Sequence, residues 1–239
     1  MVELLSPVGD FDCLKAAVQN GANAVYFGGQ LFNARYSAKN FDKDGIREAV
    51  NYAKSRNVKI NFTLNILLKN NEFDDAIEVV KYIYELGVDA VIVDDFGFAK
   101  YIIDNFPGME VHGSTQMTIH NLEGAIALKN LGYSRVVLAR ESTLSDIDYI
   151  CRNANIDIEA FVHGALCISY SGQCLFSSAI GGRSGNRGRC AQPCRMYYNM
   201  LETSDNVSYK NIGKGFLISP RDLCGLDFIP DLIKAGVKS

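Results

Sequence analysis

The sequence predicts an α/β protein of the TIM-type (β/α)8 barrel class. Three observations favour this class: short apolar segments alternate with amphipathic ones, the alternation repeats along most of the chain, and several amphipathic segments end in a glycine just before the next apolar segment. Alternation of this kind is typical of parallel strands joined by right-handed helical crossovers. Because seven apolar segments recur, we expect a barrel rather than an open, doubly wound sheet.

The expected strands are short runs rich in Val, Ile, Phe or Leu, as in buried parallel strands. In chain order, the segments that contain them are 2–7, 23–29, 59–67, 89–95, 110–116, 135–141 and 158–164. Between the first of these strands, segments 11–22, 42–57 and 72–88 carry apolar residues at spacings of three and four, which indicates amphipathic helices. The glycines at the ends of such helices supply the left-handed turn that leads into the next strand.

The last residues repeat the pattern of a helix end. In segment 232–239 a glycine is followed by Lys238 and Ser239, which we expect to open an eighth strand. We therefore expect a barrel truncated before its eighth strand, with a natural seven-stranded open barrel as the alternative. The expected organisation is strands one to seven of the barrel over 1–163, a Cys/Gly/Arg-rich insertion over 164–222, and the last barrel helix over 223–239.

Composition excludes several classes of protein. With 239 residues, 48% hydrophobic residues and a net charge of -3, the chain can build a core but is not a general nucleic-acid coating protein. No apolar run approaches the roughly 18 residues of a membrane span, and the first residues lack a signal-peptide pattern. Dinucleotide, Walker, zinc-protease and serine-hydrolase motifs are absent. Seven cysteines in a chain too long to need disulfide staples favour a reducing cytoplasm.

The cysteines of the insertion indicate a metal or cluster site. Their spacing is Cys167-x6-Cys174-x15-Cys190-x3-Cys194, with Cys224 further along. Thiolates this dense in a cytoplasmic protein hold zinc or an iron–sulfur cluster. The short paired spacings of zinc ribbons do not occur, so the pattern favours a cluster, with zinc and buried inert thiols as alternatives. Cys13 and Cys151 lie on expected helical faces, where packing explains them.

Several stretches resemble peptidase family U32, the collagenase-like group. The stretch HGALCISYSGQCLFSS, which begins at His163, is very similar to the family signature, and Glu159-Ala160-Phe161 precedes it as the signature requires. Segments 4–29 and 114–121 look like the same family. The continuation GGRSGNRGRCAQPCR is most similar to the branch that contains the 5-hydroxycytidine hydroxylases of large ribosomal RNA, whose members carry a further C-terminal region.

The resemblance implies a function and a cofactor. Several branches of the family look like oxygen-independent hydroxylases of transfer RNA uridine, ribosomal RNA cytidine or the ubiquinone ring, and they carry a [4Fe-4S] cluster on four cysteines. The RNA-modifying branches are linked to prephenate as the source of the hydroxyl group. By position, the cysteines that match the family's ligands are Cys167, Cys174, Cys190 and Cys224. Cys194 competes for the third or fourth place.

Polar side chains at the carboxyl ends of the strands are candidates for catalysis, because (β/α)8 enzymes carry their chemistry there. The polar residues at these ends are Tyr26, Asn65, Asp94, Asp95, His112, Gln116, Arg140, Glu141 and His163. The expected catalytic residues among them are His163, His112, Gln116 and Glu141. His163 lies four residues before Cys167, so it is either a general acid or base near the metal or a residue packed beneath it. Each of the others could instead cap a helix or order a loop.

The insertion also contains a basic stretch. Its arginines are Arg183, Arg187, Arg189 and Arg195, and Tyr170 is the nearest candidate for base stacking. Guanidinium–phosphate contacts and stacking make this stretch a candidate for binding RNA, and the same charges would suit an anionic molecule such as prephenate. The alternative is an ordinary solvated loop.

Three functions are consistent with these observations. We rank an RNA base hydroxylase with an iron–sulfur cluster first. A collagenase-like peptidase is the second, although the sequence offers no recognisable protease site. A non-catalytic accessory protein, in which the cluster is structural or senses redox state, is the third.

Overall fold

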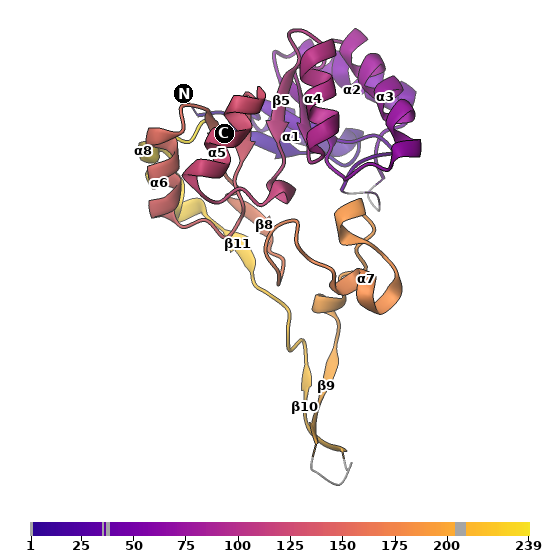
Figure 1. Ribbon diagram of the computed structural model, residues 1–239, viewed down its shortest axis with the longest axis vertical. Helices are drawn as coiled ribbons and strands as arrows, with labels where there is room; N and C mark the ends of the chain where they lie inside the picture. Colours follow the sequence, from indigo (N-terminus) through magenta and orange to yellow (C-terminus); the bar gives the residue numbers. More distant parts are fainter. Residues whose placement is uncertain (1, 35, 37–38, 204–208) are drawn as a thin grey trace.

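The computed structural model describes residues 2–34, 36, 39–203 and 209–239 (Figure 1). Its main feature is a curled parallel sheet whose strand order follows the chain, β1-β2-β3-β4-β5-β6-β7. The strands are β1 (Leu5–Pro7), β2 (Ala24–Phe27), β3 (Lys59–Leu64), β4 (Ala90–Val93), β5 (Glu110–Gly113), β6 (Arg135–Val137) and β7 (Asp157–Glu159). Each neighbouring pair is parallel, so the expected α/β class with seven parallel strands is confirmed.

A helix follows each of the first six strands. The helices are α1 (Phe11–Gln19), α2 (Lys43–Lys54), α3 (Phe73–Glu85), α4 (Phe96–Asn105), α5 (Leu122–Leu131) and α6 (Leu144–Asn153). Most begin at a side chain that accepts a hydrogen bond from the first turn, such as Asp10 before α1, Asp42 before α2 and Asn121 before α5. Such caps satisfy backbone N–H groups that the helix itself leaves unpaired, which explains where these helices start.

The largest core lies between the helices and the outer face of the sheet. Phe62 of β3, Leu14 of α1, Phe98 of α4 and Leu128 of α5 are all buried and belong to one cluster. Burying side chains of this size contributes roughly 1.5–3 kcal/mol each. Apolar packing therefore fixes the helices on the sheet.

The last residues lie between β7 and the beginning of the chain. After α8 (Ile229–Ala235), Lys238 donates its backbone N–H to Ile158 of β7 at 2.8 Å and accepts one from Glu3 at 2.8 Å. Ser239 accepts a further hydrogen bond from the backbone of Ala160 at 3.0 Å. These residues thus bridge the two edge strands of the curled sheet, where an eighth strand of a barrel would lie.

A buried charge network ties the same edges together inside the sheet. Arg135 of β6 lies 2.6 Å from Glu3 and 3.4 Å from Glu159 of β7, and its side chain is only 7% exposed. Burial raises the pKa of Glu159 to about 7, although Arg135 counteracts this rise. Arg135 therefore connects three segments that meet at the seam of the sheet.

The insertion leaves the sheet through a two-stranded antiparallel ribbon. β8 (His163–Ala165) pairs with β11 (Asp222–Cys224), and the expected boundaries at 164 and 222 fall within this ribbon. Beyond it come α7 (Phe176–Gly181) and the antiparallel hairpin of β9 (Tyr198–Thr203) and β10 (Tyr209–Gly215), which projects away from the sheet (Figure 1). Within the described ranges, no helix is both long enough and apolar enough to cross a membrane.

Replacing Arg135 with methionine should strongly destabilise the fold. The substitution leaves the buried Glu159 without a counter-charge and leaves Glu3 with only the exposed Lys59 at 3.6 Å, which costs about 3–5 kcal/mol for pairs of this kind. Urea denaturation measures the loss. Arg152→Met is the matched control, because Arg152 pairs with Asp148 on the surface of α6 and its loss should change stability little. Equal effects of the two substitutions would contradict the role given to Arg135.

Candidate functional site

The insertion is anchored to the carboxyl edge of the sheet by Ser171. This serine is 1% exposed, and both its backbone N–H and its hydroxyl donate to Glu141 Oε1, at 3.0 and 3.2 Å. Its carbonyl accepts a hydrogen bond of 2.7 Å from the Thr118 hydroxyl. Glu141 follows β6 and Thr118 follows β5, so the loops after two neighbouring strands hold one residue of the insertion. The structure thus places Glu141, an expected catalytic residue, in an anchoring contact.

The next residue, Gly172, packs directly on the backbone after β5. Its φ is +77°, and a Cβ atom at this position would lie 1.9 Å from the carbonyl oxygen of Gln116. Only glycine tolerates both this conformation and this approach. The side chain of Gln116 donates to the carbonyl of Asn65 at 3.0 Å, so it links the loops after β5 and β3. The structure therefore gives Gln116 a part in holding this edge together.

A second glycine makes a similar contact with the loop after β2. Gly188 has a φ of +71°, and a Cβ atom there would lie 2.4 Å from the carbonyl oxygen of Asn33. The preceding residue, Arg187, donates to Leu67 O at 2.7 Å and to Glu72 Oε1 at 2.5 Å. The insertion therefore contacts the loops after β2, β3, β5 and β6, all of them at the carboxyl edge, where barrel enzymes carry their sites.

Cys167 lies within electrostatic range of three other cysteines of the insertion. Burial raises the pKa of Cys167, the guanidinium of Arg140 lowers it, and Cys174, Cys190 and Cys194 are close enough to raise it further. A Cβ atom on Gly185 would lie 3.7 Å from Cys190 Cβ and 3.8 Å from the carbonyl oxygen of Cys174, so these two segments are adjacent. In the part of the chain that the structure describes, no three of the His, Cys, Asp and Glu side chains already stand at metal-binding distances.

Cys224 occupies a different position. It lies on β11 directly opposite His163 of β8. Cys167 lies two residues beyond the end of β8 at Ala165, whereas Cys224 pairs with the first residue of that strand. The structure thus places Cys224 inside the ribbon and Cys167 just beyond its other end.

The sulfur of Cys190 accepts a backbone hydrogen bond. The N–H of Gln192 donates to Cys190 Sγ at 3.3 Å. Hydrogen bonds of this kind stabilise a thiolate and raise the reduction potential of a cluster bound to it. The soft donor set and this contact fit zinc or an iron–sulfur cluster, while harder oxygen-bound cations would need a different set of ligands.

His163 and Arg140 line a cavity beside these cysteines. The cavity has a volume of about 650 Å³ and lies between β1, β7, the β8–β11 ribbon and α8. Its wall is mainly apolar, and its polar side chains are those of Glu3, Ser6, Tyr26, Arg140, Glu159, His163 and Ser239. The guanidinium of Arg140 stacks 4.3 Å from the ring centroid of Phe161. A cation held in this way in the wall of a cavity suits an anionic group on a small molecule.

His112, another expected catalytic residue, is enclosed within the curl of the sheet. Its side chain is 1% exposed, its Nε2 lies 3.1 Å from Glu110 Oε2, and Arg135 is its register partner on β6. Burial lowers the pKa of His112, so the imidazole is neutral near pH 7. Among the contacts that the structure describes, none joins His112 to the insertion.

The expected RNA-binding residues divide into two groups. Arg187 and Arg195 are paired with acidic side chains, Glu72 at 2.5 Å and Asp222 at 2.8 Å. Arg183 and Arg189 are exposed, and Tyr170 is 62% exposed. Only part of the basic stretch is therefore available to a ligand in this structure.

Sequence reasoning did not single out the residues that position the insertion. Ser171, Gly172 and Gly188 make its closest contacts with the sheet, and Arg140 was one of many polar residues at strand ends. The Ser171-Gly172 pair between Cys167 and Cys174 is the signal that could have identified a docking point. Which surface it contacts could not be read from the chain.

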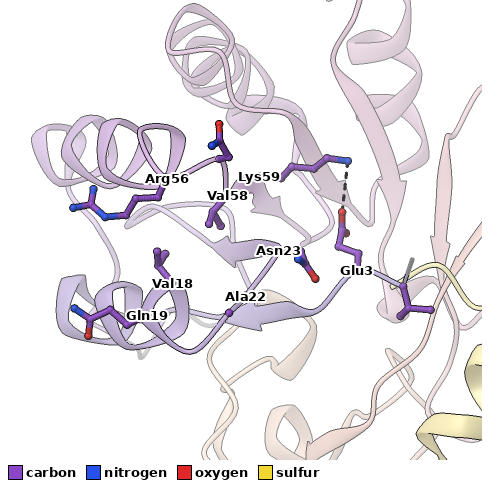
Figure 2. A pocket seen from close by; sticks show the side chains of 11 residues that line it. Glu3, Val18, Gln19, Ala22, Asn23, Arg56, Val58 and Lys59 are labelled. Carbon is purple, nitrogen blue, oxygen red and sulfur yellow. Dashed lines mark ion pairs between the residues drawn. The ribbon is translucent and has the colours of Figure 1, made fainter.

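A second pocket lies at the opposite, amino-terminal edge of the sheet (Figure 2). It has a volume of about 700 Å³ and an open shape, and the ion pair of Lys59 with Glu3, at 3.6 Å, lies on its rim. Arg56 stacks there on Tyr52, with 3.8 Å between the guanidinium carbon and the ring centroid. Residues at this edge of a barrel serve stability rather than chemistry, so we do not assign a function to this pocket.

Replacing Gly172 with alanine should release the insertion from the sheet. The added Cβ atom would collide with the Gln116 carbonyl, so the contact made by Ser171 and Gly172 cannot form. Limited proteolysis should then cut within 164–222 much faster than in the wild type. Gly182→Ala is the matched control, because Gly182 has a φ of +65° but nothing within 4 Å of its Cβ position. Wild-type resistance of the Gly172 variant would contradict this docking mode.

Asp94, at the carboxyl end of β4, should make stability depend on pH. Burial and the neighbouring Asp95 raise the pKa of Asp94 to about 6. The folded protein binds this proton more tightly than the unfolded chain, so the stabilisation is complete below about pH 4 and is lost as the pH rises through about 6. The free energy of unfolding of Asp94→Asn, minus that of the wild type, should rise by on the order of 3 kcal/mol from pH 4 to 7. Urea titrations that give a constant difference would contradict the assignment.

The chain is similar in sequence to several known proteins. The chain is 42% identical over 239 residues to the 23S rRNA 5-hydroxycytidine C2501 synthase of Escherichia coli K12, of which it covers 35%. It is 38% identical to tRNA hydroxylation protein P1 of Bacillus subtilis 168 and 33% identical to a collagenase of Porphyromonas gingivalis W83, covering 57% and 59% of them. The chain thus spans between about a third and three fifths of these relatives.

A solved structure shares the fold. The U32 peptidase Mk0906 superposes with a TM-score of 0.61 over 69% of this chain and 70% of that protein, at 14% identity. The model of peptidase family U32 matches residues 9–239. The chain therefore belongs to peptidase family U32.

Proposed function

We propose that the protein is an oxygen-independent RNA base hydroxylase that carries an iron–sulfur cluster on its insertion. The observation that carries the proposal is the grouping of Cys167 with three other cysteines on a segment docked at the carboxyl edge of the sheet. The names of relatives that modify ribosomal and transfer RNA support the substrate class. Free thiols at all seven cysteines support a reducing cytoplasm as the location.

The proposed cluster ligands are Cys167, Cys174 and Cys190, with a fourth thiolate from Cys194 or Cys224. Proximity to Cys167 supports Cys194, whereas the spacing along the chain matches Cys224 to the family pattern. Zinc is the alternative metal for the same thiolates. A cluster at this position supplies one-electron transfer beside the cavity.

The residues of the cavity then have separate tasks. Arg140 binds an anionic group of a substrate, and prephenate, as a possible hydroxyl donor, has carboxylates of the required charge. Phe161 holds the guanidinium in place by stacking. His163, which also lines the cavity, is the candidate general acid or base.

A collagenase-like peptidase is the second candidate, because one relative carries that name. A cysteine peptidase needs a thiol that donates to an imidazole. Among the contacts that the structure describes, no hydrogen bond joins a cysteine to a histidine, and His163 faces Cys224 only as its backbone partner in the ribbon. A non-catalytic protein that senses redox state ranks third.

Analysis of RNA nucleosides tests the reaction. Mass spectrometry of ribosomal and transfer RNA from a strain that lacks the gene should reveal the loss of one hydroxylated pyrimidine. The wild-type gene should restore the nucleoside and the Cys167→Ala variant should not, because the cluster would lose a ligand. Unchanged RNA, together with cleavage of gelatin by the metal-free protein, would favour the peptidase instead.

The iron content of anaerobically purified variants identifies the fourth ligand. Cys194→Ala should lose iron and sulfide if Cys194 is the ligand, while Cys224→Ala keeps them, and the reverse result assigns Cys224. Cys13→Ala and Cys151→Ala are controls, because these cysteines lie on α1 and α6, away from the insertion. Zinc in place of iron in the wild type would contradict the proposed cluster.

A further inference from the structure

The four arginines of the insertion do two different jobs. Arg187 is held by Glu72 and by the carbonyl of Leu67, and its side chain is 29% exposed. Arg195 donates to Asp222 at 2.8 Å and to the carbonyl of Leu166 at 3.2 Å, which ties the short helix η4 (Pro193–Arg195) to the β8–β11 ribbon. Both charges are neutralised within the protein, so these two arginines serve its architecture.

Arg183 and Arg189 are arranged differently. Arg183 donates from Nε to the carbonyl of Arg189 at 3.1 Å, which keeps the two residues side by side. The guanidinium carbon of Arg189 lies 5.3 Å from the ring centroid of Tyr36, which is itself 48% exposed. Neither arginine meets an acidic side chain in the ranges that the structure describes. The result is an exposed pair of cations beside an exposed aromatic ring.

Gly188 produces this division. The backbone of Gly188 packs on Asn33 with a φ of +71°, so the chain turns at Gly188. The side chains of the residues before and after it therefore contact different loops. Arg187 reaches the loop after β3, and Arg189 reaches Tyr36 in the loop after β2. The next residue after Arg189 is Cys190, so the exposed pair adjoins the cysteines.

We propose that Arg183, Arg189 and Tyr36 form the surface that binds the RNA strand next to the cysteines. This proposal rests on the proposed function. Two unneutralised guanidiniums fit the backbone phosphates of a single strand, and the ring of Tyr36, with Arg189 on it, offers a platform for an unstacked base. The pair is exposed, outside the lining of the 650 Å³ cavity, which suits a polymer rather than a small anion.

The test is RNA binding by the full-length protein as a function of salt. The probe is a fluorescent single-stranded RNA oligonucleotide containing cytidine and uridine, read by anisotropy between 50 and 200 mM salt. Arg183→Ala/Arg189→Ala should weaken binding about tenfold at the highest salt and flatten the plot of log K against log salt by about 1.4, for two phosphate contacts on a single strand. Tyr36→Ala should weaken binding with little change in slope, since stacking releases no counterions.

Two control variants isolate the role of this surface. Arg56→Ala removes a similar arginine stacked on a tyrosine, but at the opposite edge of the sheet (Figure 2), and should bind as the wild type does. Arg183→Lys/Arg189→Lys loses the guanidinium geometry but keeps the charge, so it should restore the salt slope. Iron content and proteolysis of each variant establish that the insertion is still folded.

The outcomes separate this surface from the enzyme itself. Wild-type affinity and slope in the double alanine variant, with RNA bound by the wild type, would overturn the surface and leave the proposed function intact. If the wild type does not bind RNA, both fail. A third outcome is that polyglutamate displaces the labelled RNA as effectively as unlabelled RNA does and that Tyr36→Ala has no effect. This outcome would assign the surface to an acidic protein partner and overturn the proposal.

Discussion

The close approach of Gly172 to the backbone after β5 is the contact on which the rest of the site depends. A Cβ atom there would lie 1.9 Å from Gln116 O, so the two backbone segments approach each other at a distance that only glycine permits. Ser171 completes the contact with hydrogen bonds to Glu141 and Thr118. Because Cys167 and Cys174 flank these two residues closely in the chain, the same contact fixes where their thiols lie relative to the sheet.

Charged side chains have different roles inside the sheet and on the insertion. The chain carries a net charge of -3, yet the insertion brings its cations to the carboxyl edge, where Arg140 lies near Cys167. Inside the sheet, Arg135 is neutralised by Glu3 and Glu159 and joins the edge strands. Arg135 with its acidic partners therefore holds the framework, while Arg140, Arg183 and Arg189, which have no acidic partner in the described residues, lie on the insertion or against it. This separation lets one chain combine a stable barrel seam with a surface that attracts anions.

The sequence predicted the sheet well because its information is local. Alternating apolar segments and glycines at helix ends placed all seven parallel strands, and the segment expected as a helix at 42–57 contains α2, Lys43–Lys54. The ribbon of β8 and β11 and the hairpin of β9 and β10 were not expected. Their strands are short or polar, and β8 and β11 pair across about sixty residues of sequence, which leaves no periodic pattern to read.

The candidate site shows the same limit. Spacing identified the cysteines, but it could not decide whether Cys194 or Cys224 is the fourth cluster ligand. That choice depends on where the fold places each thiol relative to Cys167, and Cys224 lies in the β8–β11 ribbon. Likewise Arg187 looked available for RNA, although Glu72, 115 residues earlier in the chain, neutralises it. The sequence identified which residues are chemically capable, and only the fold reveals which of them already have partners.

Anomalous scattering at the iron edge from crystals of the anaerobically purified protein tests the central claim most directly. The account predicts one strong peak on the insertion, surrounded by the sulfur atoms of Cys167, Cys174 and Cys190 and adjoining the contact of Gly172 with Gln116. An iron peak elsewhere, or a zinc signal at this position, would contradict the account. It would also be contradicted if the anaerobic protein held no iron and the side chains of Cys167, Cys174 and Cys190 pointed apart.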